Sequence, residues 1–230
     1  MDTNGQPGIA FDVYGTLVDP LGMSVHLRRW VGDAADQVAR VWREKQLEYT
    51  WRRALMGAYA PFSICTAQAL AYAFAQAGAT LTPDAQTDLM IAYRALPAFA
   101  DAAAGLAQIR LAGYRMVAFS NGEADAVRAV LSAAGLMEYL DDVVSVDEVG
   151  SYKPDRAVYH HMVKRMGVAA DRISMVSSNP FDVIGAKAAG LRVAWVRRRP
   201  DAQFDPWDVA PDLIVEHLGG LAAALSGERI

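Results

Sequence analysis

The chain has 230 residues, of which 53% are hydrophobic and 21% charged, and its formal net charge is −4. This composition is typical of a globular protein, and the negative charge argues against a nucleic-acid surface, because no basic stripe is available to neutralise phosphates. The single cysteine, Cys65, excludes an intrachain disulfide bond. No apolar run approaches the roughly 20 residues of a membrane span, and the first residues lack the features of a signal peptide, so we expect a cytoplasmic protein.

The first hundred residues predict one strand followed by helices. Residues 8–15 form a short apolar run broken by glycine, which is typical of a buried strand. Residues 34–56 contain no glycine or proline and predict a long helix, and a second helix is expected at 63–77. A third helix follows Thr82, which has the character of an N-cap with proline just inside the helix, and Pro97 ends it.

After residue 100 the pattern changes to strands alternating with helices. Strands are expected within 114–122, 141–150, 172–180, 191–198 and 212–225, the last of these segments ending in a helix. Helices are expected at 123–135, 153–167 and 181–190. This alternation predicts an α/β fold with a parallel sheet. We therefore expect an α/β core domain from residues 1–16 and 100–230, interrupted by a helical domain at 17–99.

The basic run at 196–200 is interpreted as a solvated loop.

Polar side chains stand at the end of each predicted strand, where a parallel sheet binds its ligands. In chain order they are Asp12, Tyr14, Thr16, Ser120, Asn121, Lys153, Ser177, Asn179 and Asp182. Asp12 could attack as a nucleophile, Lys153 could keep it ionised, and Asp182 could act as a base toward water. Each residue alone is also typical of an ordinary turn or helix cap. Their occurrence in this order is difficult to obtain from turn chemistry alone.

The segments DVYGT, SNG, KP and SSNPFD resemble the four motifs of the haloacid dehalogenase superfamily, in order and over essentially the whole chain. The resemblance implies a Rossmann-like parallel-sheet core with an inserted all-helical cap that closes the site. The helical stretch after the first motif corresponds to that cap.

Tyr14 distinguishes between branches of this superfamily. The phosphatase branch carries Asp-x-Asp, whose second aspartate protonates the leaving alkoxide, and this chain has Tyr14 at that position. The phosphatases also bind Mg²⁺ through carboxylates, and Ser178 replaces the metal-binding aspartate. A halide leaving group needs neither a proton nor a metal, so no metal and no cofactor are expected. The chain, including residues 41–62, is similar to L-2-haloacid dehalogenases of type II.

The resemblance implies a catalytic set of Asp12, Thr16, Lys153, Tyr159, Ser177, Asn179 and Asp182. In this set Asp12 attacks C2 of a short 2-haloalkanoic acid and displaces halide with inversion, and Lys153 orients Asp12. Asp182, Ser177 and Asn179 place the water that cleaves the ester to give a 2-hydroxy acid. Thr16 and Tyr159 match supporting positions.

The resemblance also implies a binding set of Tyr14, Arg43, Leu47, Phe62, Ser120, Asn121 and Phe181. Arg43 and Asn121 would hold the departing halide, and Ser120 with nearby backbone amides would hold the substrate carboxylate. An apolar wall would consist of Tyr14, Leu47, Phe62 and Phe181. Arg43 and Leu47 share a helix face because they are one turn apart. Without the resemblance, pairing of Arg43 with Glu44 or Glu48 would be the favoured interpretation.

Two residues depart from the expected pattern, and both concern substrate preference. Glu44 stands where glutamine is expected and adds negative charge near an anion site, and Phe181 replaces an expected tryptophan, which would widen the pocket.

Two alternative functions remain open at this point. One is a Mg²⁺-dependent phosphatase or phosphonatase of the same superfamily, and the other is a non-catalytic binding module. The expected partners are a small halogenated carboxylic acid and water, with no nucleic acid and no membrane. The aromatic and leucine residues of the 34–56 helix make a homodimer through the cap region a further hypothesis.

Overall fold

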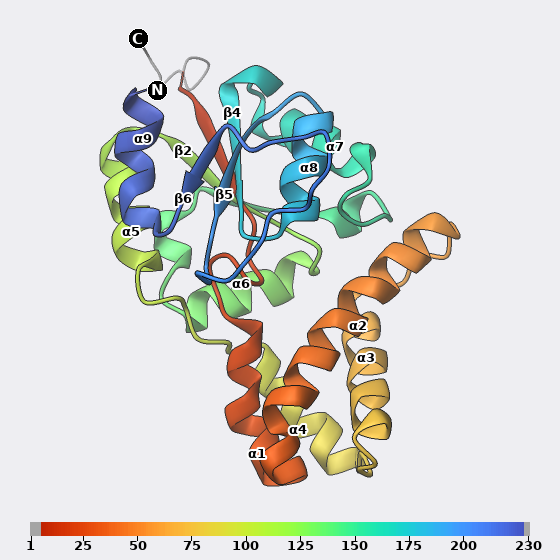
Figure 1. Cartoon of the computed structure of the whole chain (residues 1–230). Helices are drawn as coiled ribbons and strands as arrows, with labels where there is room; N and C mark the ends of the chain where they lie inside the picture. The colour runs from red at the N-terminus through yellow and green to blue at the C-terminus, as the bar shows by residue number, and fades with distance from the viewer. Residues whose placement is uncertain (1–5, 228–230) are drawn as a thin grey trace.

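Figure 1 shows a computed structural model of the chain, in which residues 6–227 are described. Six parallel strands form one sheet in the order β3-β2-β1-β4-β5-β6. The strands are β1 (Gly8–Phe11), β2 (Arg115–Ser120), β3 (Asp142–Ser145), β4 (Ile173–Ser177), β5 (Arg192–Val196) and β6 (Leu213–Val215). The predicted α/β fold with a parallel sheet is confirmed.

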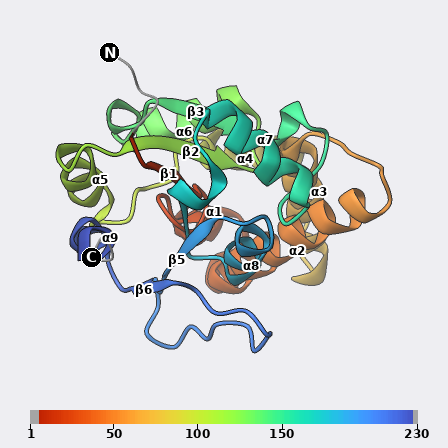
Figure 2. The ribbon, with the colours of Figure 1, turned by 90° about the horizontal axis from the view of Figure 1, so that it is seen from above.

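The strand β1 lies at the centre of the sheet, between β2 and β4. Ile9 is opposite Met116 of β2 and Ser174 of β4, and all four residues of β1 are buried. Helices α5 (Ala102–Leu111) and α9 (Leu221–Gly227) cover one face of the sheet, and α7 (Arg156–Met166) and α8 (Pro180–Ala188) cover the other (Figures 1 and 2). Strands that are covered on both faces are apolar throughout, which explains the continuous hydrophobic run of β1.

Four helices from the segment after β1 lie together beyond the carboxyl ends of the strands (Figure 1). They are α1 (Ser24–Val31), α2 (Ala35–Leu55), α3 (Phe62–Gln76) and α4 (Pro83–Tyr93). The indole N–H of Trp42 on α2 donates to the carbonyl of Thr66 on α3 at 2.8 Å, and Trp42 is buried. Thr82 caps α4 as predicted, because its side chain accepts a hydrogen bond from the N–H of Ala85 at 3.1 Å. The exact division into domains at residues 17 and 99 stays a prediction.

The sequence reading identified no helix at 24–31 or 102–111, and both segments are helical. Helix α1 is only eight residues long, so its apolar pattern covers too few turns to stand out in the sequence. Helix α5 contains Gly105, which permits close approach: a Cβ atom at this position would lie 2.4 Å from the Cβ of Leu218. Helix α4 ends at Tyr93, earlier than Pro97. The remaining predicted strands and helices are present within a few residues of their expected ends.

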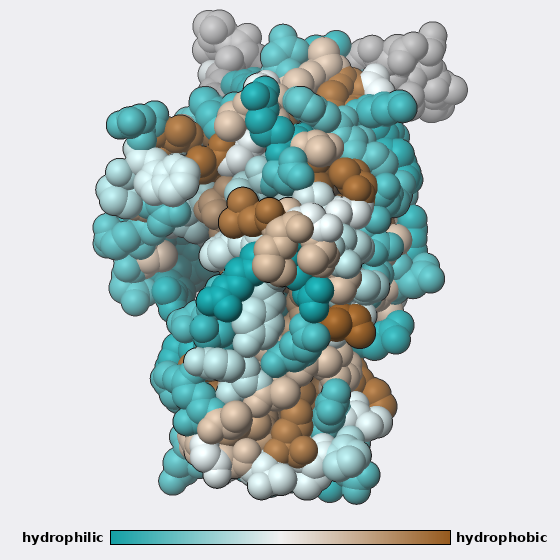
Figure 3. Space-filling model, turned by 90° about the vertical axis from the view of Figure 1, so that its right-hand side faces the viewer, coloured by the Kyte–Doolittle hydropathy of each residue, from teal (hydrophilic) through white to brown (hydrophobic). Residues whose placement is uncertain are grey.

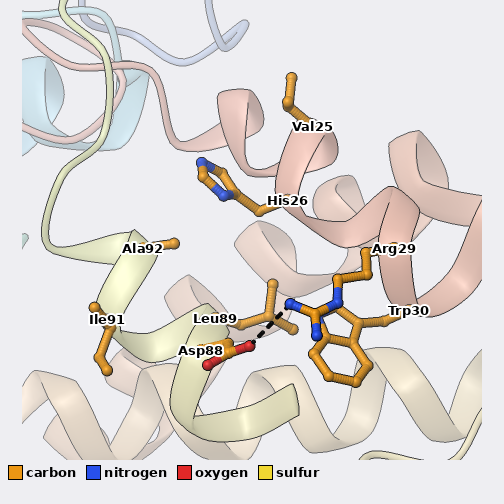
Figure 4. Close-up of a pocket in the computed structure, with 8 residues that line it drawn as sticks. All are labelled: Val25, His26, Arg29, Trp30, Asp88, Leu89, Ile91 and Ala92. Carbon is orange, nitrogen blue, oxygen red and sulfur yellow. Dashed lines mark hydrogen bonds and ion pairs between the residues drawn. The ribbon is translucent and has the colours of Figure 1, made fainter. Parts of the chain in front are cut away.

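The face shown in Figure 3 is mainly hydrophilic, with apolar residues in small separate patches. Within residues 6–227, no helix combines the length and the apolar character that crossing a membrane requires. A surface cavity of about 420 Å³ lies between α1 and α4, where Arg29 pairs with Asp88 beside Leu89 (Figure 4). None of the predicted site residues lines this cavity.

Helix α6 (Ala124–Ala133) follows the turn after β2 and also bears on the site. It packs along β3, and Gly135 follows its C-terminal end with a φ of +67°, the left-handed conformation that closes a helix. The β2–α6 turn, the loop after β3 and the β4–α8 turn therefore all lie at the carboxyl edge of the sheet, next to the end of β1.

Candidate active site

Asp12 is the first residue after β1, and the sheet holds its backbone in place. Its N–H donates to the carbonyl of Val176 at 2.9 Å, and the residue is 7% exposed. The chain turns sharply after it, at Gly15, where φ is +94°. Residues with a side chain are strained in that conformation, so glycine permits the turn that returns Thr16 toward Asp12.

The carboxylate of Asp12 accepts hydrogen bonds from three elements of the fold. Its Oδ2 accepts from the hydroxyl of Thr16 and from Nδ2 of Asn179, both at 2.8 Å. Its Oδ1 accepts from Nζ of Lys153 at 3.2 Å. These three donors fix the direction of both oxygens. The arrangement suits a carboxylate that attacks a carbon centre from a fixed position.

Lys153 joins the two carboxylates of the site. Its Nζ lies 3.2 Å from Oδ1 of Asp12 and 3.0 Å from Oδ2 of Asp182, and it also donates to the carbonyl of Phe119 at 2.8 Å. The lysine side chain is 1% exposed. A buried ammonium is tolerated only where it is paired and hydrogen-bonded, and here all three of its donors have acceptors.

Asp182 is fully buried in the first turn of α8, and Tyr159 reaches it from α7. The hydroxyl of Tyr159 donates to Oδ1 of Asp182 at 2.8 Å. Burial raises the pKa of Asp182, while the neighbouring Lys153 ammonium and the hydrogen bond from Tyr159 act in the opposite direction. Burial also raises the pKa of Tyr159 well above its ordinary value, so the phenol keeps its proton and remains a donor. A carboxylate with a raised pKa is better suited to accept a proton.

Tyr14 belongs to an aromatic wall rather than to the polar centre. Its ring centroid lies 5.6 Å from that of Phe62 and 5.7 Å from that of Tyr93. Burial raises the pKa of the Tyr14 phenol, which is therefore neutral. Phe181 packs edge-on against Trp51 of α2 at 5.1 Å. Leu47 is half-buried on α2, one turn from Arg43.

Arg43 reaches from α2 to the loop that carries the nucleophile. Its Nη2 donates to the carbonyl of Tyr14 at 2.9 Å, and its Nη1 donates to Oε1 of Gln46 at 2.8 Å. Among the residues that the structure describes, no carboxylate pairs with Arg43, and Glu48 pairs with Lys45 instead. The interpretation of Arg43 as half of a surface ion pair is therefore wrong.

Three predicted polar residues support the turns at the strand ends. The hydroxyl oxygen of Ser120 accepts from the N–H of Gly122, and that of Ser177 accepts from the N–H of Asn179, each at 3.1 Å. Oδ1 of Asn121 accepts from the N–H of Lys153 at 3.0 Å, which leaves its Nδ2 group to donate elsewhere. Their contacts with a ligand stay predictions.

Gln46 is a buried residue that the sequence reading did not identify. Its Oε1 accepts from Arg43 and from the hydroxyl of Tyr93 at 3.1 Å, and its Nε2 donates to Oγ1 of Thr66 at 2.7 Å. The amide thereby fixes the direction of the Arg43 guanidinium. Its position three residues after Arg43 on a helix was a signal for this contact.

Arg198 corrects the interpretation of the basic run at 196–200. Its Nη2 and Nε donate to the carbonyl of Thr16 at 2.6 Å and 3.1 Å, and its Nη1 pairs with Asp101 at 2.6 Å. The side chain is only 9% exposed, so it is not a solvated loop residue. Arg198 instead holds the loop whose hydroxyl contacts Asp12. No local sequence signal marks it, because its partners are remote along the chain.

The residues at this edge do not fit the Mg²⁺ site of the superfamily's phosphatases. The hydroxyl of Ser178 donates to the carbonyl of Gly15 at 2.6 Å, where those enzymes use a carboxylate. Of the corresponding acidic set, only Asp12 and Asp182 are carboxylates among the described residues, and both accept from Lys153. In the described part of the chain, no three histidine, cysteine, aspartate or glutamate side chains gather in a way that could hold a metal ion.

The sheet order and the two lysine-linked carboxylates at its carboxyl edge define a Rossmann-like α/β protein with a charged site beside the central strand. A sequence profile of haloacid dehalogenase-like hydrolases matches residues 7–190. The chain is 38% identical over 188 residues to (S)-2-haloacid dehalogenase 1 of Pseudomonas sp. (strain CBS-3), covering 82% of this chain and 83% of that protein. It is 35% identical to (S)-2-haloacid dehalogenase of Pseudomonas fluorescens, covering 94% of each.

The structural comparison agrees with these relatives. L-2-haloacid dehalogenase from Xanthobacter autotrophicus, solved with chloropropionic acid covalently bound, superimposes with a TM-score of 0.91 at 34% identity, covering 96% of this chain and 99% of that one. The chain therefore belongs to the haloacid dehalogenase-like hydrolase family.

Proposed function

We propose that the protein hydrolyses the carbon–halide bond of short 2-haloalkanoic acids, namely L-2-haloacids and haloacetates, to give 2-hydroxy acids. The observation that carries this proposal is the buried Lys153 ammonium between Asp12 and Asp182, with Tyr14 in place of a general acid. Two relatives that share most of their length with this chain are (S)-2-haloacid dehalogenases. The reaction consumes one water and releases one halide and one proton.

In the first step, a carboxylate oxygen of Asp12 attacks C2 of the substrate from the side opposite the halogen. The new C–O bond forms as the carbon–halogen bond breaks, so the configuration at C2 inverts and an aspartyl ester results. Thr16, Asn179 and Lys153 hold the Asp12 carboxylate while it attacks. The halide leaves as an anion and needs no proton, which agrees with the neutral, buried phenol of Tyr14.

We assign the departing halide to Arg43 and Asn121. The guanidinium of Arg43 is anchored by Gln46 and by the carbonyl of Tyr14 rather than by a carboxylate, so its positive charge remains available to an anion. Nδ2 of Asn121 is the complementary neutral donor. Ser120 and the backbone amides that follow Asp12 hold the substrate carboxylate. The wall around the reacting carbon consists of Tyr14, Leu47, Phe62 and Phe181.

In the second step, water attacks the carbonyl carbon of the Asp12 ester. Asp182 accepts the water proton, which its raised pKa favours, and Ser177 and Asn179 place the water. The acyl C–O bond breaks, and the leaving alkoxide takes the proton from Asp182 and departs as the 2-hydroxy acid. The Asp12 carboxyl group, which now holds an oxygen from water, releases the second water proton to solvent. Tyr159 and Lys153 hold Asp182 throughout.

The decisive experiment measures halide release from chloroacetate and from each enantiomer of 2-chloropropionate, with and without EDTA. We expect release from the L-enantiomer, insensitivity to EDTA and loss of activity in Asp12→Asn. One turnover in H₂¹⁸O would place the label in Asp12 and distinguish ester hydrolysis from direct attack of water on C2.

A parallel assay with a generic phosphomonoester and Mg²⁺ tests the phosphatase alternative. Phosphate release without halide release would replace the proposed function by that alternative. A stable complex with chloride or a carboxylate, formed without turnover of either substrate, would support the non-catalytic binding module.

Two further expectations belong to the same proposal. We infer a cytoplasmic protein, supported by the single cysteine, which is a buried free thiol.

We also infer a homodimer through the helical segment, whose exposed apolar residues include Val25, Leu55, Met56 and Ile91. Much of the predicted apolar stripe on the 34–56 helix packs against the rest of the chain, because Trp42 and Val38 are buried. Light scattering on the eluted protein tests the dimer, and a monomer mass would reject it.

A further inference from the structure

Two cavities are lined in part by residues of the loop that follows Asp12, namely Gly15 and Tyr14. The first, here called the basic cavity, has a volume of about 410 Å³ and is lined by Gly15, Arg40, Arg43, Asn179, Trp195 and Arg199, among others. The second, here called the tyrosine cavity, has a volume of about 460 Å³ and is lined by Tyr14, Phe62, Tyr93, Arg94, Glu123 and Asp125, among others. Either is large enough for a small carboxylic acid.

The basic cavity is the one whose wall touches the nucleophile. Asn179 lines it, and Nδ2 of Asn179 donates to Oδ2 of Asp12 at 2.8 Å. Arg43 also lines it and donates to the carbonyl of Tyr14. The tyrosine cavity meets the site through the aromatic wall of Tyr14 and Phe62, and through Tyr93, which is hydrogen-bonded to Gln46. Asn179 therefore links the basic cavity directly to the Asp12 carboxylate.

The charges of the two cavities differ in sign. The guanidinium groups of Arg40, Arg43, Arg198 and Arg199 line the basic cavity, together with the carboxylates of Asp19 and Glu44. Arg198 is balanced by Asp101 in the fold, and Arg199 lies 3.7 Å from Asp201 in a solvent-exposed pair that water screens. Arg40 bonds to the neutral Gln37. The tyrosine cavity has two carboxylates, Glu123 and Asp125, and one arginine, Arg94.

We propose that the basic cavity is the route by which the anionic substrate reaches Asp12 and by which the halide and the hydroxy acid leave, with Arg40 and Arg199 gathering anions at its rim. The proposal rests on the proposed function, under which the haloacid substrate, the hydroxy acid product and the released halide are all anions. A cleft with an excess of one sign of charge raises the local concentration of the opposite ion, and salt weakens this effect. The formal net charge of the whole chain is −4, so the excess of arginine in this cavity is opposite in sign to the chain as a whole.

Glu44 opposes the accumulation of anions in the basic cavity. It is exposed on α2 beside Arg43 and lines the same cavity. Its carboxylate reduces the positive potential at the rim and thereby lowers the affinity for a second carboxylate. Glu44 is therefore assigned a role in substrate affinity rather than in the chemical steps.

The test compares Arg40→Gln, Arg199→Gln and their double variant with Arg94→Gln as the matched control in the tyrosine cavity. Arg40, Arg94 and Arg199 are exposed, so the fold tolerates their replacement. The measurement is kcat and KM for chloroacetate between about 10 mM and 500 mM ionic strength, a range over which the Debye length falls from roughly 30 Å to below 8 Å. We expect the double variant to lose about 3- to 10-fold in kcat/KM at low salt, through KM, with kcat unchanged. Glu44→Gln should raise kcat/KM at low salt.

Three results would overturn the route: an equal loss in Arg94→Gln, a loss that persists at high salt, or a loss in kcat rather than in KM. Halide release by the wild-type protein is measured first. If the wild-type protein releases no halide, the proposed function fails, and this result is distinct from failure of the route. Calorimetric titration with glycolate then tests the cavity without turnover. Weaker glycolate binding in the double variant than in Arg94→Gln supports the cavity, and equal binding in the two rejects it.

Discussion

The hydroxyl of Tyr159 donates a hydrogen bond to Oδ1 of Asp182 at 2.8 Å, inside a site where Asp182 is fully buried. This bond stabilises the ionised carboxylate and lowers the pKa of Asp182, against the burial that raises it. Asp182 must be ionised to accept a proton, so activity falls as the pH drops through its pKa. We therefore expect the acid limb of the kcat profile to lie above the ordinary range of aspartate.

Tyr159→Phe removes this donor, so the pKa of Asp182 should rise further. A hydrogen bond to a charged group is worth about 1.5–3 kcal/mol, so its loss disfavours the ionised carboxylate. The acid limb of kcat should move to higher pH, with a lower rate near neutrality. Tyr72→Phe, on the exposed face of α3, serves as the control. An acid limb that stays in place in Tyr159→Phe would remove Asp182 from the role of base.

Gly185 makes the contact between Tyr159 and Asp182 possible. A Cβ atom at position 185 would lie 2.6 Å from the hydroxyl oxygen of Tyr159 and 2.6 Å from Cβ of Pro154. Alanine is the better helix former by about 1 kcal/mol, but these contacts require a shift of buried neighbours that costs more. We expect Gly185→Ala to lower both the free energy of unfolding and kcat.

The control for Gly185→Ala is Gly227→Ala, since nothing lies within 4 Å of a Cβ atom at that position of α9. Denaturant unfolding and steady-state kinetics on both variants provide the measurement. Wild-type kcat and an unchanged acid limb in Gly185→Ala would show that Tyr159 does not need its present position.

Arg198 is a positioning residue for the nucleophile, acting through Thr16. Replacing it by glutamine removes both hydrogen bonds to the Thr16 carbonyl and leaves Asp101 without its cation. We expect a destabilisation of about 1–3 kcal/mol and a fall in kcat of about 10-fold or more, with KM little changed. Arg198→Lys should recover part of the stability but not the forked hydrogen bonding, because an ammonium lacks the planar fork.

Arg197→Gln is the matched control for Arg198, because Arg197 is adjacent and pairs with the exposed Glu216. Arg197→Gln should keep wild-type kcat. If Arg198→Gln loses stability but keeps kcat at a temperature where it is folded, Arg198 is structural only.

Gln46 holds the guanidinium that we assign to the halide. Gln46→Leu leaves the hydroxyls of Tyr93 and Thr66 without this partner and frees Arg43 to reorient. Because chloride is a poorer leaving group than bromide, loss of halide stabilisation should slow chloroacetate more than bromoacetate. Gln37→Leu on the exposed face of the same helix is the control. An equal fall for both halides would assign Gln46 to the stability of the helical segment alone.

Much of this architecture could be predicted from the sequence because the signals are local. The apolar run before Asp12 and the alternation after residue 100 reflect the two periodicities of strands and helices, and they predicted the parallel sheet correctly. Parallel strands bring their carboxyl ends to one edge, so the order of Asp12, Lys153 and Asp182 along the chain was enough to expect them together. The substitution of Tyr14 for a carboxylate was likewise visible in the sequence.

The tertiary structure alone decided which remote residues hold that site in place. Arg198 lies 182 residues from Thr16, yet the two are hydrogen-bonded because β5 returns the chain to the edge where β1 ends. Gly185 looks like an ordinary helix residue until α7 places the Tyr159 hydroxyl against it. The charge of a cavity depends in the same way on which distant side chains share it. Local sequence propensity determines which secondary structure a segment forms, whereas contacts between residues remote along the chain arise only when several segments have packed together.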